Sequence, residues 1–163
     1  MKFGFKRIAA ALLAFTIVLT AGACGKKEEA SGADLSALFE KCVAADTRLP
    51  EMKTISSSDA DADINFTVLC DMEYDRIAEY HYTYAADGSA PEIALIKVAD
   101  KSDVATLMTK LKDHVKDRQG AMAEYSPEQV EQVSAYVLAH KDDMVLLAIG
   151  PQNGLVQKAF EEE

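Results

Sequence analysis

The residue with the most specific chemical setting in this sequence is Cys24. It directly follows three small residues, Ala21, Gly22 and Ala23. Small side chains let a peptidase bind the chain in an extended form, and the thiol of the cysteine can carry a lipid. We therefore expect the chain to be cut before Cys24 and the new N-terminal residue to be lipidated.

The residues before this cysteine are typical of an export signal. Three cationic side chains precede an apolar run from Ile8 to Leu19. A membrane-spanning helix needs about 20 predominantly apolar residues, and this run ends sooner, which favours a cleaved signal. Residues 1–23 resemble a bacterial lipoprotein signal peptide with residues 21–24 as its lipobox, although such boxes more often begin with leucine. Ordinary secretion with an unmodified Cys24 is the alternative.

A lipid on Cys24 predicts a location on the outer face of the cell membrane. One acyl chain binds a bilayer only marginally, whereas the two chains of a diacylglyceryl group give stable attachment. Residues 24–33 are small and charged and show no apolar periodicity, so we expect a flexible tether. We expect residues 34–163 to form one α+β domain, because about 130 residues can bury roughly two-thirds of their unfolded surface.

The sequence that follows residue 23 is strongly acidic. Residues 1–23 contain three of the 17 Lys and Arg and none of the 27 Asp and Glu, which leaves 14 basic against 27 acidic residues and a formal charge of −13. Proteins that bind nucleic acid normally carry a basic patch, and this charge would repel anionic lipids or wall polymers. We therefore expect no nucleic acid partner, while cations and basic proteins are compatible with the charge.

Two further cysteines, Cys42 and Cys70, are expected to lie outside the cytoplasm. A disulfide can persist there, and closing the loop between them would stabilise the fold. Cysteine is also among the most buried residue types, so two separate buried thiols fit the sequence equally well. Spacing alone does not show whether the two Cβ atoms meet, and both alternatives stay open.

An acidic run that contains Asp59, Asp61 and Asp63 invites comparison with a calcium loop. A helix-loop-helix calcium site needs Gly at its sixth position and Glu at its twelfth. Here those positions hold Ile64 and Cys70. We therefore expect a solvated acidic loop, with no metal and no cofactor.

Motifs of the common enzyme classes are missing from the sequence, which has no Gly-rich phosphate loop, serine elbow, Cys-x-x-Cys or His-Glu-x-x-His. The three histidines, His81, His114 and His140, fall in separate predicted elements, and we expect them to stay apart. We therefore expect a non-enzymatic binding or interaction module whose partner is an unknown protein or a small ligand. A cell-envelope hydrolase that uses acidic residues and a small-solute-binding lipoprotein are the alternatives.

Hydrophobic periodicity predicts the helices and strands that position these residues. The expected order is helix, hairpin, long helix, hairpin, helix, over residues 35–46, 77–84 with 92–98, 104–123, 134–141 with 144–150, and 153–160. Residues 51–63 are expected to be an irregular loop. Because hairpins alternate with amphipathic helices, we expect an α+β fold: an antiparallel sheet of about four strands in two hairpins, with helices packed on one face.

Four tyrosines and one arginine are ambiguous within this scheme. Tyr80, Tyr82 and Tyr84 share one face of a predicted strand, and Tyr136 lies in the second hairpin. They are candidate partner contacts if helices leave that face open, and core residues if helices cover it. Arg118 falls on the apolar stripe of the long helix, where it either reaches water or pairs with an acid from the sheet, and we favour the first.

Several short motifs follow the lipobox cysteine in a fixed order: Leu49-Pro50-Glu51-Met52, Ile77-Ala78-Glu79-Tyr80, Glu92-Ile93-Ala94-Leu95-Ile96-Lys97-Val98 and Tyr125-Ser126-Pro127-Glu128-Gln129. In their order and spacing they resemble those of a family of bacterial lipoproteins, domain of unknown function 4358. The likeness covers most of residues 35–162. It implies a small extracytoplasmic lipoprotein, mainly of single-membrane bacteria. It transfers no catalytic residue, because no activity is assigned to the family.

Overall fold

The computed structural model describes residues 34–162. Its elements are, in chain order, α1 (Leu35–Ala45), β1 (Met52–Ser56), α2 (Ala62–Phe66), η1 (Tyr74–Arg76), β2 (Ile77–Ala85), β3 (Glu92–Val98), η2 (Lys101–Asp103), α3 (Val104–Tyr125), η3 (Pro127–Gln129), α4 (Val130–Ser134), β4 (Val137–Lys141), β5 (Met144–Ile149) and α5 (Asn153–Glu161). The predicted signal peptide, the lipidated Cys24 and the tether lie outside the described residues.

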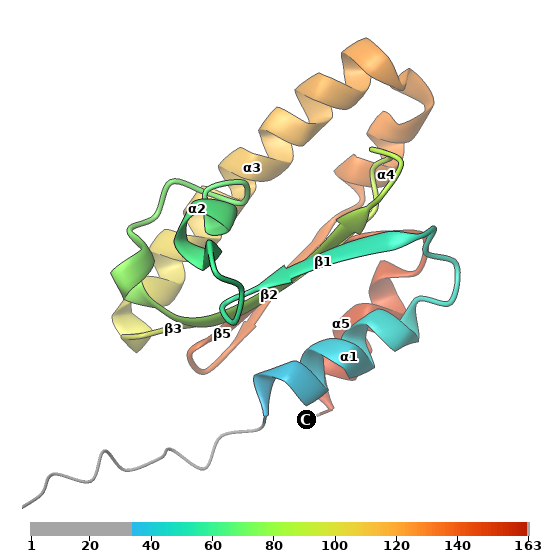
Figure 1. Ribbon diagram of the computed structural model, residues 1–163. Coiled ribbons are helices and arrows are strands. Elements are labelled where there is room, and N and C mark those ends of the chain that lie inside the picture. The colour runs from blue at the N-terminus through green and yellow to red at the C-terminus, as the bar shows by residue number, and fades with distance from the viewer. Residues whose placement is uncertain (1–33, 163) are drawn as a thin grey trace, which may run out of the picture. The chain divides into compact units, whose positions relative to one another are not determined.

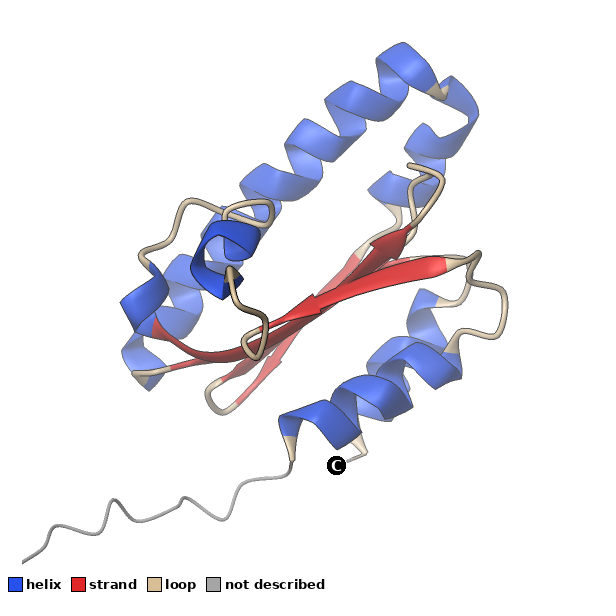
Figure 2. Cartoon of the chain, viewed as in Figure 1, coloured by secondary structure: helices blue, strands red, loops and turns tan. Residues whose placement is uncertain are grey.

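The five strands within residues 34–162 form one antiparallel sheet in the order β1-β2-β3-β5-β4, with β3 at its centre. Helices α1 and α5 pack on one face of the sheet, and α2, α3 and α4 pack on the other (Figure 1). Figure 2 shows the strands lying between these two helical layers. The α+β class is confirmed. The predictions of about four strands and of helices on one face alone are wrong.

The central strands explain why helices cover both faces. In β3, Ile93 and Leu95 point into the cluster under α1 and α5, while Ala94 and Ile96 point into the cluster under α3. All four side chains are fully buried. A strand that is apolar on both sides has to be covered on both sides, so the continuous apolar run in this strand demands a second helical layer.

Strand β1 is the element that the sequence analysis assigned to an irregular loop. It pairs with β2 from Met52 opposite Ala85 to Ser56 opposite His81. It is an edge strand with mostly polar side chains, and its backbone makes the pairing. Hydrophobic periodicity does not predict this strand, because an edge strand with polar side chains needs no alternation of apolar residues.

The structure separates Cys42 from Cys70. Cys42 belongs to the cluster under α1 and α5, and Cys70 belongs to the cluster on the opposite face of the sheet. Both side chains are buried, and they are not bonded to each other. Two separate buried cysteines are therefore the correct alternative, because the sheet lies between them. Burial raises the pKa of the Cys70 thiol.

The end of α1 is fastened to the start of α5 by the buried carboxylate of Asp46. Its Oδ1 accepts a hydrogen bond from the backbone N–H of Arg48 at 3.0 Å, and its Oδ2 accepts one from the N–H of Gln152 at 2.8 Å. The backbone N–H of Thr47 donates to the side chain of Gln152 at 3.0 Å. A Cβ atom at Gly150 would lie 2.7 Å from Asp46 Oδ2, so glycine is needed there to leave room for the carboxylate.

Helix α3 is the longest helix described and ends two residues beyond the predicted position. Its buried side chains form one stripe that faces the sheet: Val104, Leu107, Leu111, Val115 and Met122. Within residues 34–162, no helix combines the length and the apolar character needed to cross a bilayer.

Candidate ligand-binding pocket

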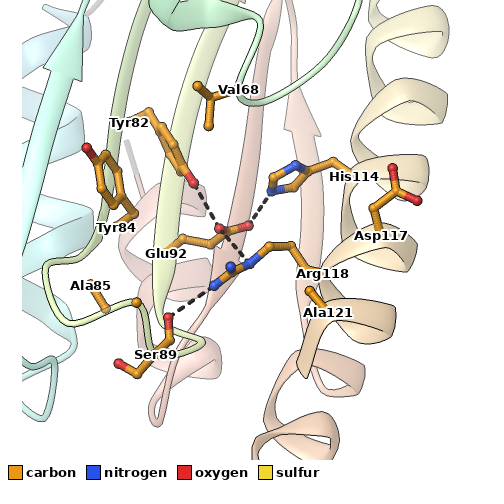
Figure 3. A pocket seen from close by; sticks show the side chains of 11 residues that line it. Val68, Tyr82, Tyr84, Ala85, Ser89, Glu92, His114, Asp117, Arg118 and Ala121 are labelled. Atoms are coloured by element: carbon orange, nitrogen blue, oxygen red, sulfur yellow. Dashed lines mark hydrogen bonds and ion pairs between the residues drawn. The ribbon is translucent and has the colours of Figure 1, made fainter. Parts of the chain in front are cut away.

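A pocket of about 400 Å³ lies between the β2–β3 hairpin and α3 (Figure 3). The two strands provide one wall, α3 provides the opposite wall, and the loop after α2 contributes to the rim. The pocket is lined by Val68, Tyr82, Tyr84, Ala85, Gly88, Ser89, Glu92, His114, Asp117, Arg118 and Ala121. Its size falls in the range of about 300–1,000 Å³ that is usual for small-molecule sites.

Glu92 forms the floor of this pocket. It is the first residue of β3 and is 1% exposed. It lies in the same phase of the strand as Ala94 and Ile96, which directs its side chain toward α3. A buried carboxylate needs hydrogen-bond donors and a compensating charge, and Glu92 has both.

Three side chains surround the carboxylate, and we call Tyr82, Glu92, His114 and Arg118 the Glu92 network (Figure 3). The hydroxyl of Tyr82 donates to Glu92 Oε2 at 2.9 Å, and His114 Nε2 lies 2.6 Å from Oε1. Arg118 Nε lies 3.4 Å from Oε2, within ion-pair distance. Because an ionised carboxylate only accepts hydrogen bonds, His114 donates from Nε2. Both oxygens of Glu92 are therefore engaged.

Helical geometry positions two members of the Glu92 network. His114 and Arg118 are four residues apart in α3, so their side chains lie one above the other on the same face. The same region of the helix surface carries Leu111 and Val115, whose burial directs it toward the sheet. The helix thereby presents one imidazole and one guanidinium to the carboxylate of β3.

Arg118 also holds the β2–β3 turn. Its Nη2 donates to the carbonyl oxygen of Ser89 at 3.0 Å and lies 3.4 Å from that of Ala90. The side chain is 24% exposed, and its buried Nε makes no hydrogen bond with the residues that the structure describes, although it faces Glu92. The prediction that Arg118 reaches out to water is wrong. It pairs with an acid from the sheet, because Glu92 places a buried negative charge within its reach.

The aromatic side of the pocket comes from β2. The rings of Tyr82 and Tyr84 lie 5.3 Å apart between centroids, at an interplanar angle of 32°. Burial and the negative charge of Glu92 raise the pKa of Tyr82 well above its ordinary value. Tyr82 therefore keeps its proton and donates to Glu92 throughout the neutral pH range.

The four tyrosines predicted as candidate partner contacts do not form an open surface. Tyr80 and Tyr82 are 0% and 3% exposed, and Tyr84 and Tyr136 are partly buried against the same cluster. The hydroxyl of Tyr80 donates to the carbonyl oxygen of Ala62 at 2.8 Å, and burial raises the pKa of Tyr80 to about 12. They are core and pocket residues, because α2 and α3 cover this face of the sheet.

A second pocket of about 330 Å³ adjoins the first along α3. The two share Val68, His114 and Asp117 in their walls. In the wall of the second pocket, Lys110 Nζ lies 2.7 Å from Asp71 Oδ1. This hydrogen bond lowers the pKa of the Asp71 carboxyl. The two pockets therefore follow one side of the helix.

The three histidines lie in different parts of the fold. His81 stacks on Phe39 of α1 at 5.3 Å between ring centroids, on the face opposite the pocket. His140 is exposed on β4, and His114 belongs to the pocket. Among residues 34–162, no group of three or more His, Cys, Asp or Glu side chains is arranged to hold a metal ion.

Sequence reasoning did not bring Glu92, His114 and Arg118 together. A usable signal exists, because a glutamate stands in an otherwise apolar strand and two polar residues stand four positions apart beside an apolar helix stripe. Each of these is an exception to the pattern around it. The link between them needs a contact across 22 residues of chain, which periodicity alone does not provide.

The fold and the pocket define a class of protein: an α+β domain in which two helical layers enclose an antiparallel sheet, with a pocket over a buried charged floor. The chain belongs to the family described as domain of unknown function (DUF4358), whose sequence model matches residues 53–150. This confirms the predicted family, and the match covers the motifs from Ile77 onward. The matched residues contain the whole Glu92 network. No curated protein and no solved structure matches the chain.

Proposed function

We propose that this protein is a lipoprotein held on the outer face of the cell membrane through a lipid on Cys24, and that its domain binds a small ligand without converting it. The anchor is supported by the signal-like residues 1–23 and by the lipobox. The binding role is carried by one observation, the pocket above the Glu92 network.

The polar floor of the pocket is held in place by contacts between the protein's own side chains. Tyr82, His114 and Arg118 hold Glu92 from two different elements. Arg118 is held in turn by the carbonyl oxygen of Ser89. Groups fixed in this way lose little conformational freedom when a ligand arrives, which favours binding. A few convergent polar groups within a largely apolar concave surface are the usual composition of small-molecule sites.

The same geometry favours binding over hydrolysis of envelope material. A general acid or base needs a proton or a lone pair directed at the substrate. Both oxygens of Glu92 already accept from the Glu92 network, and the other carboxylate in the pocket, Asp117, comes from the exposed surface of α3. Hydrolysis would need a carboxylate in the pocket floor that is free to exchange a proton with the substrate. Ligand binding has no such requirement and therefore fits the arrangement better.

The pocket is tested by filling it. A mixed library of small fragments is screened by ligand-observed NMR against the full chain in a mild detergent. Ala121→Trp places a large side chain in the pocket wall, and Ala105→Trp makes the same change on the exposed side of the same helix. We expect fragments that bind the wild type to be lost from Ala121→Trp and kept by Ala105→Trp. Binding that survives Ala121→Trp, or no binding fragment at all, would reject the pocket as the functional site.

The anchor is tested by fractionation. Wild type and Cys24→Ser are expressed in a bacterium fed a labelled fatty acid. We expect the wild type in the membrane fraction with label, and Cys24→Ser without it. Recovery of the wild type as an unlabelled cytosolic protein that retains residues 1–23 would rule out the lipid anchor.

A further inference from the structure

We propose that the ligand of this pocket is a small organic cation, an ammonium group carried on an apolar body. This inference rests on the proposed ligand-binding function and specifies the charge of the ligand. It follows from the charges that the pocket leaves uncompensated, from its aromatic wall and from the charge of the whole domain.

One carboxylate in the pocket wall, that of Asp117, has no partner among the described residues. The carboxylate of Glu92 is compensated by Arg118 at 3.4 Å. Asp117 lines both pockets and makes no hydrogen bond or ion pair with any residue of the described part of the chain. Asp117 is therefore a negative charge without a partner at the α3 wall of the pocket. A bound cation would supply the missing positive charge.

An anion is disfavoured by the state of Arg118. Its guanidinium already faces the buried Glu92 carboxylate and donates to the carbonyl oxygen of Ser89. An incoming carboxylate would have to share that charge with Glu92 and approach Asp117, which repels it. A bare metal ion is not favoured either, because no suitable ligand group occurs within residues 34–162.

The wall opposite Asp117 offers aromatic surface (Figure 3). Tyr84 is half-buried and lines the pocket beside Tyr82, whose hydroxyl is committed to Glu92. The face of a tyrosine ring attracts an ammonium group electrostatically. Val68 and Ala121 add apolar contact for the rest of the ligand. A carboxylate facing aromatic and aliphatic walls is suited to an ammonium ion with an apolar body.

The charge of the domain favours the same ligands. Residues 34–163 contain 12 basic and 25 acidic residues, a formal charge of −13. The field of such a surface raises the local concentration of cations and lowers that of anions. Selection by charge thus begins before the ligand reaches the pocket.

The test uses ligands of one shape and three charges. Choline is compared with its neutral isostere, in which a quaternary carbon replaces the nitrogen, and with the anion of tert-butylacetic acid. Pentylammonium, pentanol and pentanoate form a second series. Binding to the full chain is followed by NMR of the pocket residues. We expect each cation to bind at least about fivefold more tightly than its neutral analogue, with the anion weakest.

Two variants distinguish a direct contact between Asp117 and the bound cation from the electrostatic field of the whole acidic domain. Asp117→Asn should weaken choline about fivefold and leave the neutral isostere unchanged. Asp113→Asn removes the same charge one turn earlier in α3, lines the second pocket and not the first, and should weaken choline about twofold or less. Tyr84→Leu should weaken both cations more than their neutral analogues.

The outcomes distinguish this inference from the function on which it rests. Neutral or anionic members that bind in the pocket as tightly as the cations would overturn the inference and leave ligand binding in place. Equal effects of Asp117→Asn and Asp113→Asn would also overturn it. If neither cation binds, the inference fails, and the fragment screen with Ala121→Trp then decides the binding function separately.

Discussion

The two faces of the sheet use burial in different ways, and two adjacent residues show the contrast. Ile93 points into the cluster under α1 and α5, where its neighbours Leu146 and Phe160 are fully buried and apolar. Glu92 is equally buried but points toward α3, where it meets Tyr82 and a guanidinium. The α1 side also has a pocket of about 380 Å³, lined by residues of α1 together with Thr54 and His81, but no buried charge lines it. The α3 face instead combines packing with a buried charged network.

Because of this difference, mutations on the two faces should reduce stability for different physical reasons. An apolar cluster stabilises the fold through the apolar area that it buries and through close packing. The unfolding free energy lost in a large-to-small substitution therefore increases with the volume of the cavity that is left. A buried charge network contributes little net stability, yet removing one member is costly because the remaining charge is uncompensated. The α1/α5 face should therefore respond to loss of volume, and the α3 face should respond to loss of partners.

The largest effect is expected on the packed face. Phe160→Ala removes a fully buried ring and should lower the free energy of unfolding by about 3–5 kcal/mol. Leu155→Ala on the same helix changes a half-exposed side chain and should cost less than about 1 kcal/mol. Urea denaturation of the full chain measures both. Similar losses for the two variants would contradict the assignment of this face as a packed core.

The second effect concerns the Glu92 network. Arg118→Met keeps most of the side-chain volume, removes the charge that compensates Glu92, and should cost about 2 kcal/mol, less than for a fully buried pair because Arg118 is partly exposed. The double variant Glu92→Gln/Arg118→Met removes both charges and should regain more than half of that loss. A strictly additive double variant in the same denaturation assay would show that the two charges are not coupled.

A smaller effect is expected for one hydrogen bond. Tyr82→Phe removes the hydroxyl that donates to Glu92 at 2.9 Å and should cost about 1–2 kcal/mol, since one donor to a buried carboxylate is lost. Tyr136→Phe is the matched control, because the hydroxyl of Tyr136 has no partner within residues 34–162. Equal unfolding midpoints for the two variants would argue against the network.

The smallest effect lies at the edge of the α3 face. Lys110 lowers the pKa of the exposed Asp71 carboxyl. A lowered folded-state pKa means that this contact contributes stability above the ordinary carboxyl pKa and loses it as the pH falls through the lowered value. Lys110→Met should therefore raise the pKa of Asp71 toward its ordinary value and slightly reduce stability at neutral pH, with no difference in strong acid. Carboxyl NMR titration measures the pKa, and Lys112→Met on the same helix should leave it unchanged.

Features that depend on neighbouring residues were predictable from the sequence. The apolar stripe of α3 and the alternation of β2 locate these elements because helical and strand periods are local properties. The start of α1 is also a local feature, because Asp34 caps it: its Oδ1 accepts a hydrogen bond from the backbone N–H of Ser36 at 3.1 Å. These signals need no knowledge of distant contacts.

Features that depend on distant contacts were not predictable in the same way. The role of Tyr80 changes from surface to core according to whether a helix covers it, and strand alternation does not decide that. β1 owes its conformation to backbone pairing with β2, and its polar side chains carry no strand signal. The partner of Arg118 became clear only once β3 and α3 were placed together.

The joint made by Asp46 has a mechanical consequence. If the chain is held through Cys24 as proposed, a force on the tether is transmitted to the domain at α1. Asp46 links the end of α1 to the start of α5 through the backbone N–H of Gln152. The load is then shared by two helices on one side of the sheet, while the pocket above the Glu92 network lies on the other side. Tension on the proposed anchor would therefore act on the face of the sheet opposite the Glu92 network and leave the walls of that pocket in place.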